Sequence, residues 1–158
     1  MLLRLESAKD AFELIGYGKV STSAANAREL GLLRQGDAIS MNQERLLADA
    51  KSAALGLVAT YAPGAPRTDI KVEGDPGYAL MKMGVYMAHQ GKFISDYDAV
   101  VGEKLAHVLS GGRVTGEQMV SEQYLLDLER EAFLSLCGNP KTQERMGYML
   151  KNGKPLRN

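Results

Sequence analysis

Apolar side chains recur every three or four positions along most of this chain, which is the spacing of an amphipathic helix. In the first such segment Leu5, Ala8 and Phe12 share one face with Ile15. Glycines and prolines interrupt the periodicity and separate about seven helices, expected near residues 5–17, 21–30, 43–61, 75–90, 95–110, 121–137 and 140–152. Because almost no segment has strand character, the predicted fold class is all-α.

Residues that accept hydrogen bonds from the first amides of a helix stand where several of these segments begin. Ser95 with Asp98 is typical of a capping box, in which each side chain bonds the other residue's amide. Asn42 is expected to cap the third helix. The sixth helix begins either at Thr115 or at Ser121.

Proline and glycine concentrate in residues 63–74 and its flanks, where they predict an extended connector. The connector divides the chain into two helical blocks, residues 1–62 and 75–158. Within the first block, Asp37–Met41 is the only plausible short strand or extended link.

The composition is that of an ordinary globular protein, with 45% hydrophobic and 24% charged residues among 158. This length suits one domain or one compact piece of a larger protein. The 19 basic and 19 acidic residues cancel, so neither nucleic acid nor an anionic membrane is an expected partner. No signal peptide or membrane span is expected. The single cysteine, Cys137, agrees with a reducing, cytoplasmic setting and is interpreted as a buried, inert thiol.

The stretch that contains Gly16, Gly18 and Lys19 has some likeness to a phosphate-binding loop. A P-loop requires a glycine five residues before the Gly-Lys pair and Ser or Thr after the lysine. Glu13 and Val20 occupy those two positions. A turn between two helices is therefore the preferred interpretation.

No catalytic or metal-binding constellation can be assembled from the sequence. His89 and His107 are not spaced as metal ligands and are interpreted as ordinary helix residues. Asp127 and Glu131 share a helix face, but flanking apolar residues favour a solvated face with modest ion pairing to Arg130. The expectation is no catalytic residue and no metal site.

Two features leave alternatives open. Met81, Met83 and Met87 either fill a core or line a pocket for a flexible apolar ligand, and core packing is preferred. Lys154 and Arg157, in the tail GKPLRN, either meet a ligand phosphate or belong to a solvated chain end, and the solvated end is preferred.

The first block resembles the later part of a crotonase-type (enoyl-CoA hydratase) domain. The resemblance rests on the A-x-E-L-I pattern of Ala11–Ile15, the turn at Gly18, the S-x-x-x-A-x-x-x-G-L pattern of residues 23–32, and the alanine-rich helix after Asn42. The second block contains GYALMKMGVYMAHQGKF and VSEQYLLDLEREAFLSLCGNPKTQERMGYMLKNGKPLRN, which look like the C-terminus of long 3-hydroxyacyl-CoA dehydrogenase proteins.

The resemblance implies the C-terminal fragment of a dehydrogenase–hydratase fusion protein of fatty-acid β-oxidation. Residues 1–62 would be the end of the hydratase-like domain, and residues 75–158 a C-terminal helical block. NAD and acyl-CoA are implied for the parent protein, with upstream domains as partners, and no cofactor for the fragment itself. No catalytic role transfers, although Tyr17, Gly18 and Lys19 are candidates for proximity to a ligand.

Two other functions remain open, a stand-alone helical interaction module and a small acyl-CoA-binding protein. A domain separated from its parent leaves apolar surface uncovered, so self-association into a homo-oligomer is expected. Leu2, Leu3, Leu5 and Phe12 are predicted to be among the groups it hides.

Overall fold

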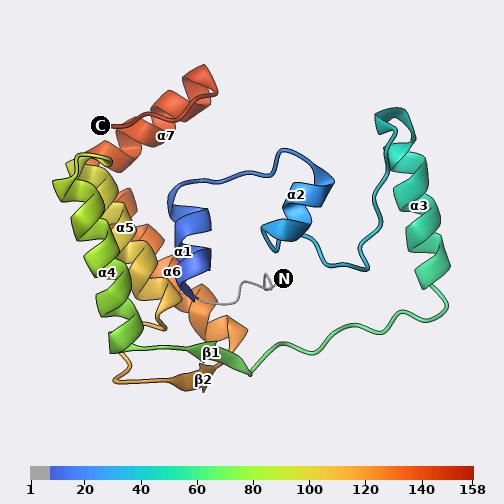
Figure 1. The fold of residues 1–158 in the computed structure, drawn as a ribbon, viewed down its shortest axis with the longest axis horizontal. Coiled ribbons are helices and arrows are strands. Elements are labelled where there is room, and N and C mark those ends of the chain that lie inside the picture. Colours follow the sequence, from blue (N-terminus) through green and yellow to red (C-terminus); the bar gives the residue numbers. More distant parts are fainter. Residues whose placement is uncertain (1–7) are drawn as a thin grey trace. The chain divides into compact units, whose positions relative to one another are not determined.

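The computed structural model describes residues 8–158, so the predictions for Leu2, Leu3 and Leu5 lie outside it. Helices dominate this part of the chain, and the all-α prediction is confirmed. The helices are α1 (Ala8–Gly16), α2 (Ala24–Glu29), the 3-10 helix η1 (Gln43–Arg45), α3 (Leu46–Leu57), α4 (Asp75–Gln90), α5 (Asp96–Leu109), α6 (Glu122–Cys137) and α7 (Pro140–Asn152) (Figure 1). Two short strands, β1 (Ile70–Val72) and β2 (Gln118–Val120), accompany them.

The described residues form two compact units. The small unit comprises residues 20–65, with α2, η1 and α3. The large unit comprises residues 8–19 and 66–158, and so contains α1 and all elements from β1 onward. The helix α1 thus packs with helices that begin almost sixty residues or more after it in the sequence. The predicted domain boundaries stay a prediction.

The predicted helix caps are confirmed. The Ser95 hydroxyl accepts a hydrogen bond from the Asp98 amide (3.1 Å), and the Asp98 carboxylate accepts one from the Ser95 amide (3.0 Å). Of the two predicted starts of the sixth helix, Ser121 is correct, because its hydroxyl accepts from the Tyr124 amide. The Asn42 side chain caps η1, which continues into α3.

The two strands were missed by the sequence patterns. They pair antiparallel, with Ile70 opposite Val120, and their buried side chains form a small apolar cluster with Val72. Three-residue strands are too short for a period-two pattern to be distinguishable. Asp37–Met41 was expected to be a short strand or an extended link, and it is a link. The described residues 20–65 contain no strand with which it could pair.

Two glycines allow close approaches near β1, one between the end of α5 and β1 and one between the start of α4 and the loop before β2. Gly111 has φ +86°, and a Cβ atom there would lie 2.5 Å from Cγ2 of Val72. Gly74, with φ +66°, precedes α4, and its Cβ would collide with the carbonyl oxygen of Val114. Both positions require glycine, because other residues are strained at positive φ and have no room here.

In the large unit α4 packs along α5, α6 packs on α5, and α1 lies against both α4 and α5 (Figure 1). The buried side chains of this bundle include Leu14, Met81, Val85, Tyr97 and Ala106. A Cβ at Gly102 of α5 would approach Cγ2 of Val85 to 3.1 Å, so the absence of a side chain there permits the close α4–α5 contact. The result is a framework of helices with α1 on one side.

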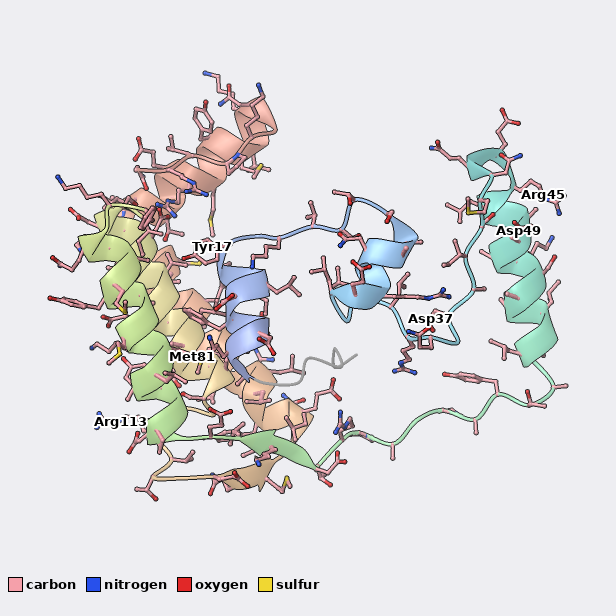
Figure 2. All side chains as sticks on the ribbon, in the orientation of Figure 1. Tyr17, Asp37, Arg45, Asp49, Met81 and Arg113 are labelled. Atoms are coloured by element: carbon pink, nitrogen blue, oxygen red, sulfur yellow. The ribbon has the colours of Figure 1, made fainter. Side chains whose placement is uncertain are left out.

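Polar contacts connect the segments of the small unit. The Arg28 guanidinium donates to the Asp37 carbonyl oxygen (2.8 Å), and the Ser40 hydroxyl donates to the carboxylate of Asp49. Arg45 and Asp49, one helical turn apart in Figure 2, form an ion pair of 3.4 Å. No side chain of α3 is buried, and Leu47 is 82% exposed.

No helix within residues 8–158 combines the length and the apolar character that crossing a bilayer requires.

Candidate functional site

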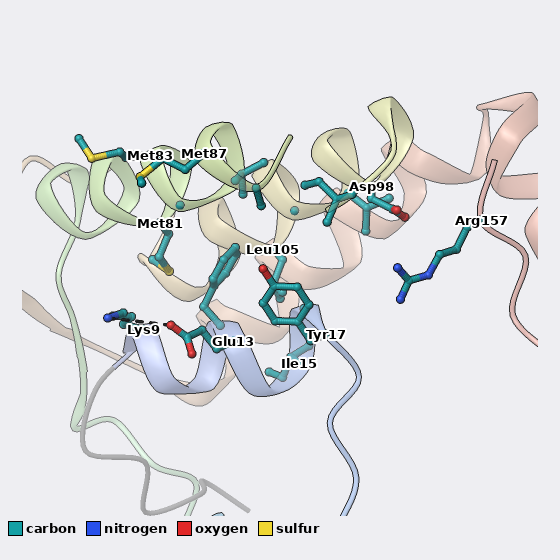
Figure 3. Close-up of a pocket in the computed structure, with 18 of the residues that line it drawn as sticks. Lys9, Glu13, Ile15, Tyr17, Met81, Met83, Met87, Asp98, Leu105 and Arg157 are labelled. Carbon is teal, nitrogen blue, oxygen red and sulfur yellow. Dashed lines mark ion pairs between the residues drawn. The ribbon is translucent and has the colours of Figure 1, made fainter. Parts of the chain in front are cut away.

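The large unit contains a pocket of about 520 Å³, lined by α1, α4, α5, Arg145 of α7 and the chain after α7 (Figure 3). Pockets of about 300–1,000 Å³ with mainly apolar walls are typical of small-molecule sites. The apolar lining comes from all four segments: Phe12, Ile15, Leu80, Met81, Met83, Val85, Met87, Ala88, Ile94, Val101, Leu105, Pro155 and Leu156.

The sequence left open whether Met81, Met83 and Met87 fill the core or line a pocket, and the structure shows both roles among them. Met81 is only 3% exposed and belongs to the buried core, yet it also reaches the pocket. Met83 and Met87 line the pocket as well, and more than half of each side chain is exposed. The preferred interpretation, core packing for all three, is therefore wrong for Met83 and Met87. Both side chains are exposed on α4, and helical spacing alone cannot tell a core face from a pocket wall.

Four of the charged groups that line the pocket are paired with each other. Lys9 and Glu13 form an ion pair of 3.9 Å on α1, and Arg145 and Asp98 form one of 2.8 Å. Partial burial acts to raise the pKa of Asp98, but hydrogen bonds from the Ser95 amide and from Arg145 outweigh it. The pKa of Asp98 is consequently held below its ordinary value, so this carboxylate stays charged and balances Arg145.

Arg157 is the charged lining residue without such a partner. Among the described residues it makes no ion pair and no hydrogen bond, and its guanidinium is directed toward the Tyr17 end of the pocket (Figure 3). Tyr17, at the C-terminal end of α1, is about half exposed and lines the pocket as well. The lining of the pocket is therefore mainly apolar, with four charged groups in pairs and the positive charge of Arg157 at one end.

The tail that carries Arg157 is fixed at its end. Arg145 donates from Nε to the side-chain oxygen of Asn158 (2.7 Å), and the Ser95 hydroxyl donates to the main-chain oxygen of Asn158 (2.9 Å). Pro155, Leu156 and Arg157 become a wall of the pocket in this way. The chain end is solvated at Pro155 and Arg157, as preferred, but it is also anchored at Asn158 by contacts from the start of α5 and from α7, which leave no local pattern in the sequence. Lys154, in contrast, is exposed and does not line the pocket.

Tyr17, Gly18 and Lys19, the three candidates for proximity to a ligand, have different positions in the structure. Only Tyr17 lines the pocket. Gly18 adopts φ +59°, which suits the turn after α1, and Lys19 lies 3.8 Å from Glu13 and over the ring of Tyr17. The glycines and the lysine thus form a helix-ending turn, as the sequence indicated.

The histidines, the cysteine and the acidic residues of α6 lie outside the pocket. His89 is hydrogen-bonded to Asp96 (2.8 Å), and this bond lowers the pKa of the Asp96 carboxylate. His107 packs edge-on against Tyr78 with 6.4 Å between the ring centroids, and Cys137 is a partly exposed free thiol.

The acidic residues of α6 lie on an exposed face, as expected. Asp127 accepts hydrogen bonds from Arg130 (2.8 Å) and Gln123 (2.9 Å). Glu129 and Glu131 are exposed. The absence of catalytic residues and of a metal site stays a prediction.

Comparison with curated proteins finds a "Probable 3-hydroxyacyl-CoA dehydrogenase" of Bacillus subtilis (strain 168), which is 45% identical over 154 residues. The alignment covers 98% of this chain but 20% of the relative, so the chain spans about a fifth of the length of that protein. No family model matches the chain, and no solved structure matches it significantly. The chain is thus similar, almost throughout, to one part of a much longer dehydrogenase.

Proposed function

We propose that this chain is the C-terminal helical segment of a larger protein of the 3-hydroxyacyl-CoA dehydrogenase type. The observation that carries the proposal is the 45% identity over 98% of the chain, against a relative about five times as long. The larger protein would oxidise a 3-hydroxyacyl-CoA with NAD and would include a crotonase-type hydratase domain, acting in fatty-acid β-oxidation. The segment itself is structural and covers catalytic domains in the rest of that protein.

The exposed apolar side chains of α3 support a covering role. Leu46, Leu47 and Leu57 are each more than half exposed, and further apolar residues follow at Val58 and Tyr61. Helices that are apolar on several sides are normally buried. Burial of a leucine side chain contributes about 1.5–3 kcal/mol, which gives α3 a strong tendency to pack on another surface.

The reading frame upstream of the Met1 codon tests the first part of the proposal. We expect an uninterrupted frame of several hundred codons that encodes a nicotinamide-binding domain. A stop codon and ribosome-binding site immediately upstream would contradict it and favour the stand-alone interaction module. The purified 158 residues should neither oxidise 3-hydroxybutyryl-CoA nor hydrate crotonyl-CoA, and either activity would contradict a purely structural segment.

Replacement of two leucines of α3 tests the covering role. Leu46→Ser with Leu57→Ser should change the unfolding free energy of the 158-residue chain by less than about 0.5 kcal/mol at concentrations where it is monomeric, because both side chains are then exposed. In the longer protein the same pair should cost about 2 kcal/mol or more, because the leucines would be buried there. Urea unfolding of both proteins gives the comparison.

Lys51→Ser, at an exposed polar position of α3, is the control and should be neutral in both proteins. The 158-residue chain should also self-associate in light scattering, and the leucine variant should do so less. Equal effects of the leucine changes in the long and short proteins would contradict a covering role for α3.

A further inference from the structure

We propose that the pocket between α1, α4, α5 and the tail binds an anionic amphiphile, with an unbranched apolar chain along the helices and a carboxylate or phosphate head at Arg157. All walls of the pocket belong to this chain. The inference therefore does not rest on the proposed function, and it holds whether or not the chain belongs to a larger dehydrogenase.

The α4 wall of the pocket includes a glycine. Gly84 lies at the centre of the α4 wall, because Leu80, Met81, Met87 and Ala88 all line the pocket and stand three or four positions from it. A Cβ atom at Gly84 would meet nothing within 4 Å. Packing within the chain therefore does not require glycine here, although glycine weakens a helix interior. An occupant from outside the chain could fill the free space beside Gly84.

The walls suit a flexible apolar chain. Met81, Met83 and Met87 contribute unbranched, polarizable side chains that adjust to an irregular ligand surface. Phe12 and Leu105 complete the apolar walls from α1 and α5. Burying the chain of an amphiphile here costs no hydrogen bond, because its methylene groups carry none, and each buried methylene favours binding.

Charge at the mouth selects the head group. Lys9 is paired with Glu13 and Arg145 with Asp98, so these four charges cancel locally. Arg157 remains, and its planar guanidinium can donate two parallel hydrogen bonds to a carboxylate or a phosphate. A cationic head would be repelled at the same position.

The fixed tail favours a small ligand over a protein segment. The pocket has walls on α1, α4, α5 and the tail, and Asn158 is held by Arg145 and Ser95, so the concavity exists before any ligand binds. Small-molecule sites are concave and largely pre-formed in this way. A protein partner would be expected to use a broader, flatter surface.

Calorimetric titration of the 158-residue chain with dodecanoate, dodecyl phosphate and dodecyltrimethylammonium, each below its micellar concentration, tests the pocket. The two anions should bind saturably at one site, about tenfold or more tighter than the cation, and salt should weaken this preference because Arg157 is exposed. If dodecyl phosphate binds more tightly than dodecanoate, the natural ligand carries a phosphate. If dodecanoate binds more tightly, the natural ligand is a free carboxylic acid. Equal affinity for the cation would overturn the role of Arg157.

Matched variants separate the two parts of the site. Gly84→Leu fills the pocket and should reduce the affinity for dodecanoate at least tenfold, whereas Gly147→Leu, at a glycine of α7 that also faces open space, should leave it unchanged. Leucine is the better helix former, so both variants are expected to fold. Arg157→Gln should remove the preference for anions, and Lys154→Gln, a tail cation outside the pocket, should keep it.

Methyl resonances of the methionines locate the ligand. Dodecanoate should shift Met81, Met83 and Met87 and leave Met41 and Met119, which are exposed elsewhere, unchanged. Shifts of all methionines alike, or undiminished binding by Gly84→Leu, would overturn the proposal. An absence of saturable binding would also overturn the proposal. If, in that case, Gly84→Leu abolished self-association of the chain, the pocket would be a contact site for a protein partner.

Discussion

The two compact units contain helices of similar local quality and differ in what covers them. In the large unit the 16 residues of α4 include three that are buried, Gly77, Met81 and Val85. In the small unit the 12 residues of α3 include none. An isolated helix of this length is marginal in water, and most helix stability in proteins comes from packing of the apolar face. The large unit therefore supplies packing for α4, whereas none of the described residues covers the apolar surface of α3.

Local signals do not reveal this difference. Ser23 of the small unit and Ser121 of the large unit cap their helices with nearly the same geometry, 3.0 and 3.1 Å to the amide three residues later. Capping depends on a few neighbouring residues, and burial depends on residues far apart in the sequence. Local residues thus determine where a helix begins, whereas packing against distant segments determines how stable the helix is.

The largest expected effect comes from the closest approach in the large unit. Gly111→Ala introduces a Cβ atom 2.5 Å from Cγ2 of Val72, at a backbone φ of +86°. Strain at positive φ adds about 1–2 kcal/mol and overpacking about 1–3 kcal/mol, so the large unit should lose about 2–5 kcal/mol in urea unfolding. Gly147→Ala, with open space around it, is the control and should be neutral or slightly stabilising. A loss below about 1 kcal/mol for Gly111→Ala would show that β1 can move away from α5.

Asp98→Asn should have an intermediate effect that depends on pH. The pKa of Asp98 is depressed in the folded chain, so its stabilising contribution is full above its unfolded value, about 3.9, and is lost as the pH falls through the folded value. The wild type should exceed the variant by about 1–3 kcal/mol at pH 7, since Arg145 loses its charged partner. The gap should narrow below about pH 4.

Thermal unfolding of both proteins across the pH range measures this gap. Asp96→Asn, in the same helical turn but exposed, is the control and should have a smaller effect than Asp98→Asn. A gap that is independent of pH would contradict the assigned role of the Asp98 charge.

The smallest expected effect compares the two caps directly. Ser121→Ala should lower the stability of the large unit by about 1 kcal/mol, because the Tyr124 amide loses its acceptor and α6 is part of the packed bundle. Ser23→Ala removes the same type of bond from α2 but should leave the unfolding of the large unit within about 0.5 kcal/mol of wild type. Amide hydrogen exchange in α6, followed in both variants, reports the difference. A similar loss of α6 protection in Ser23→Ala would show that the two units unfold together.

The sequence predicted the helices and their caps well, because both depend on local residues. A few neighbouring residues encode each of three features: the capping box of Ser95 and Asp98, the start of α6 at Ser121, and the turn after α1. The strands were missed because each has only three residues and its partner lies nearly fifty positions away. Of the pocket, the sequence offered Tyr17 as a candidate for ligand proximity and a ligand contact by the methionines or Arg157 only as the less preferred alternative, and it did not indicate that they share one cavity.

The sequence by itself determined an all-α chain, the capped starts of several helices and the similarity to part of a long dehydrogenase, since periodicity, capping residues and identity are all properties of the order of residues. Only the tertiary structure decided that α1 joins α4 and α5, that Asn158 fixes the tail, and that Gly84 faces an empty space. These features arise from contacts between distant segments, whose free energies depend on shape and burial in three dimensions rather than on local pattern.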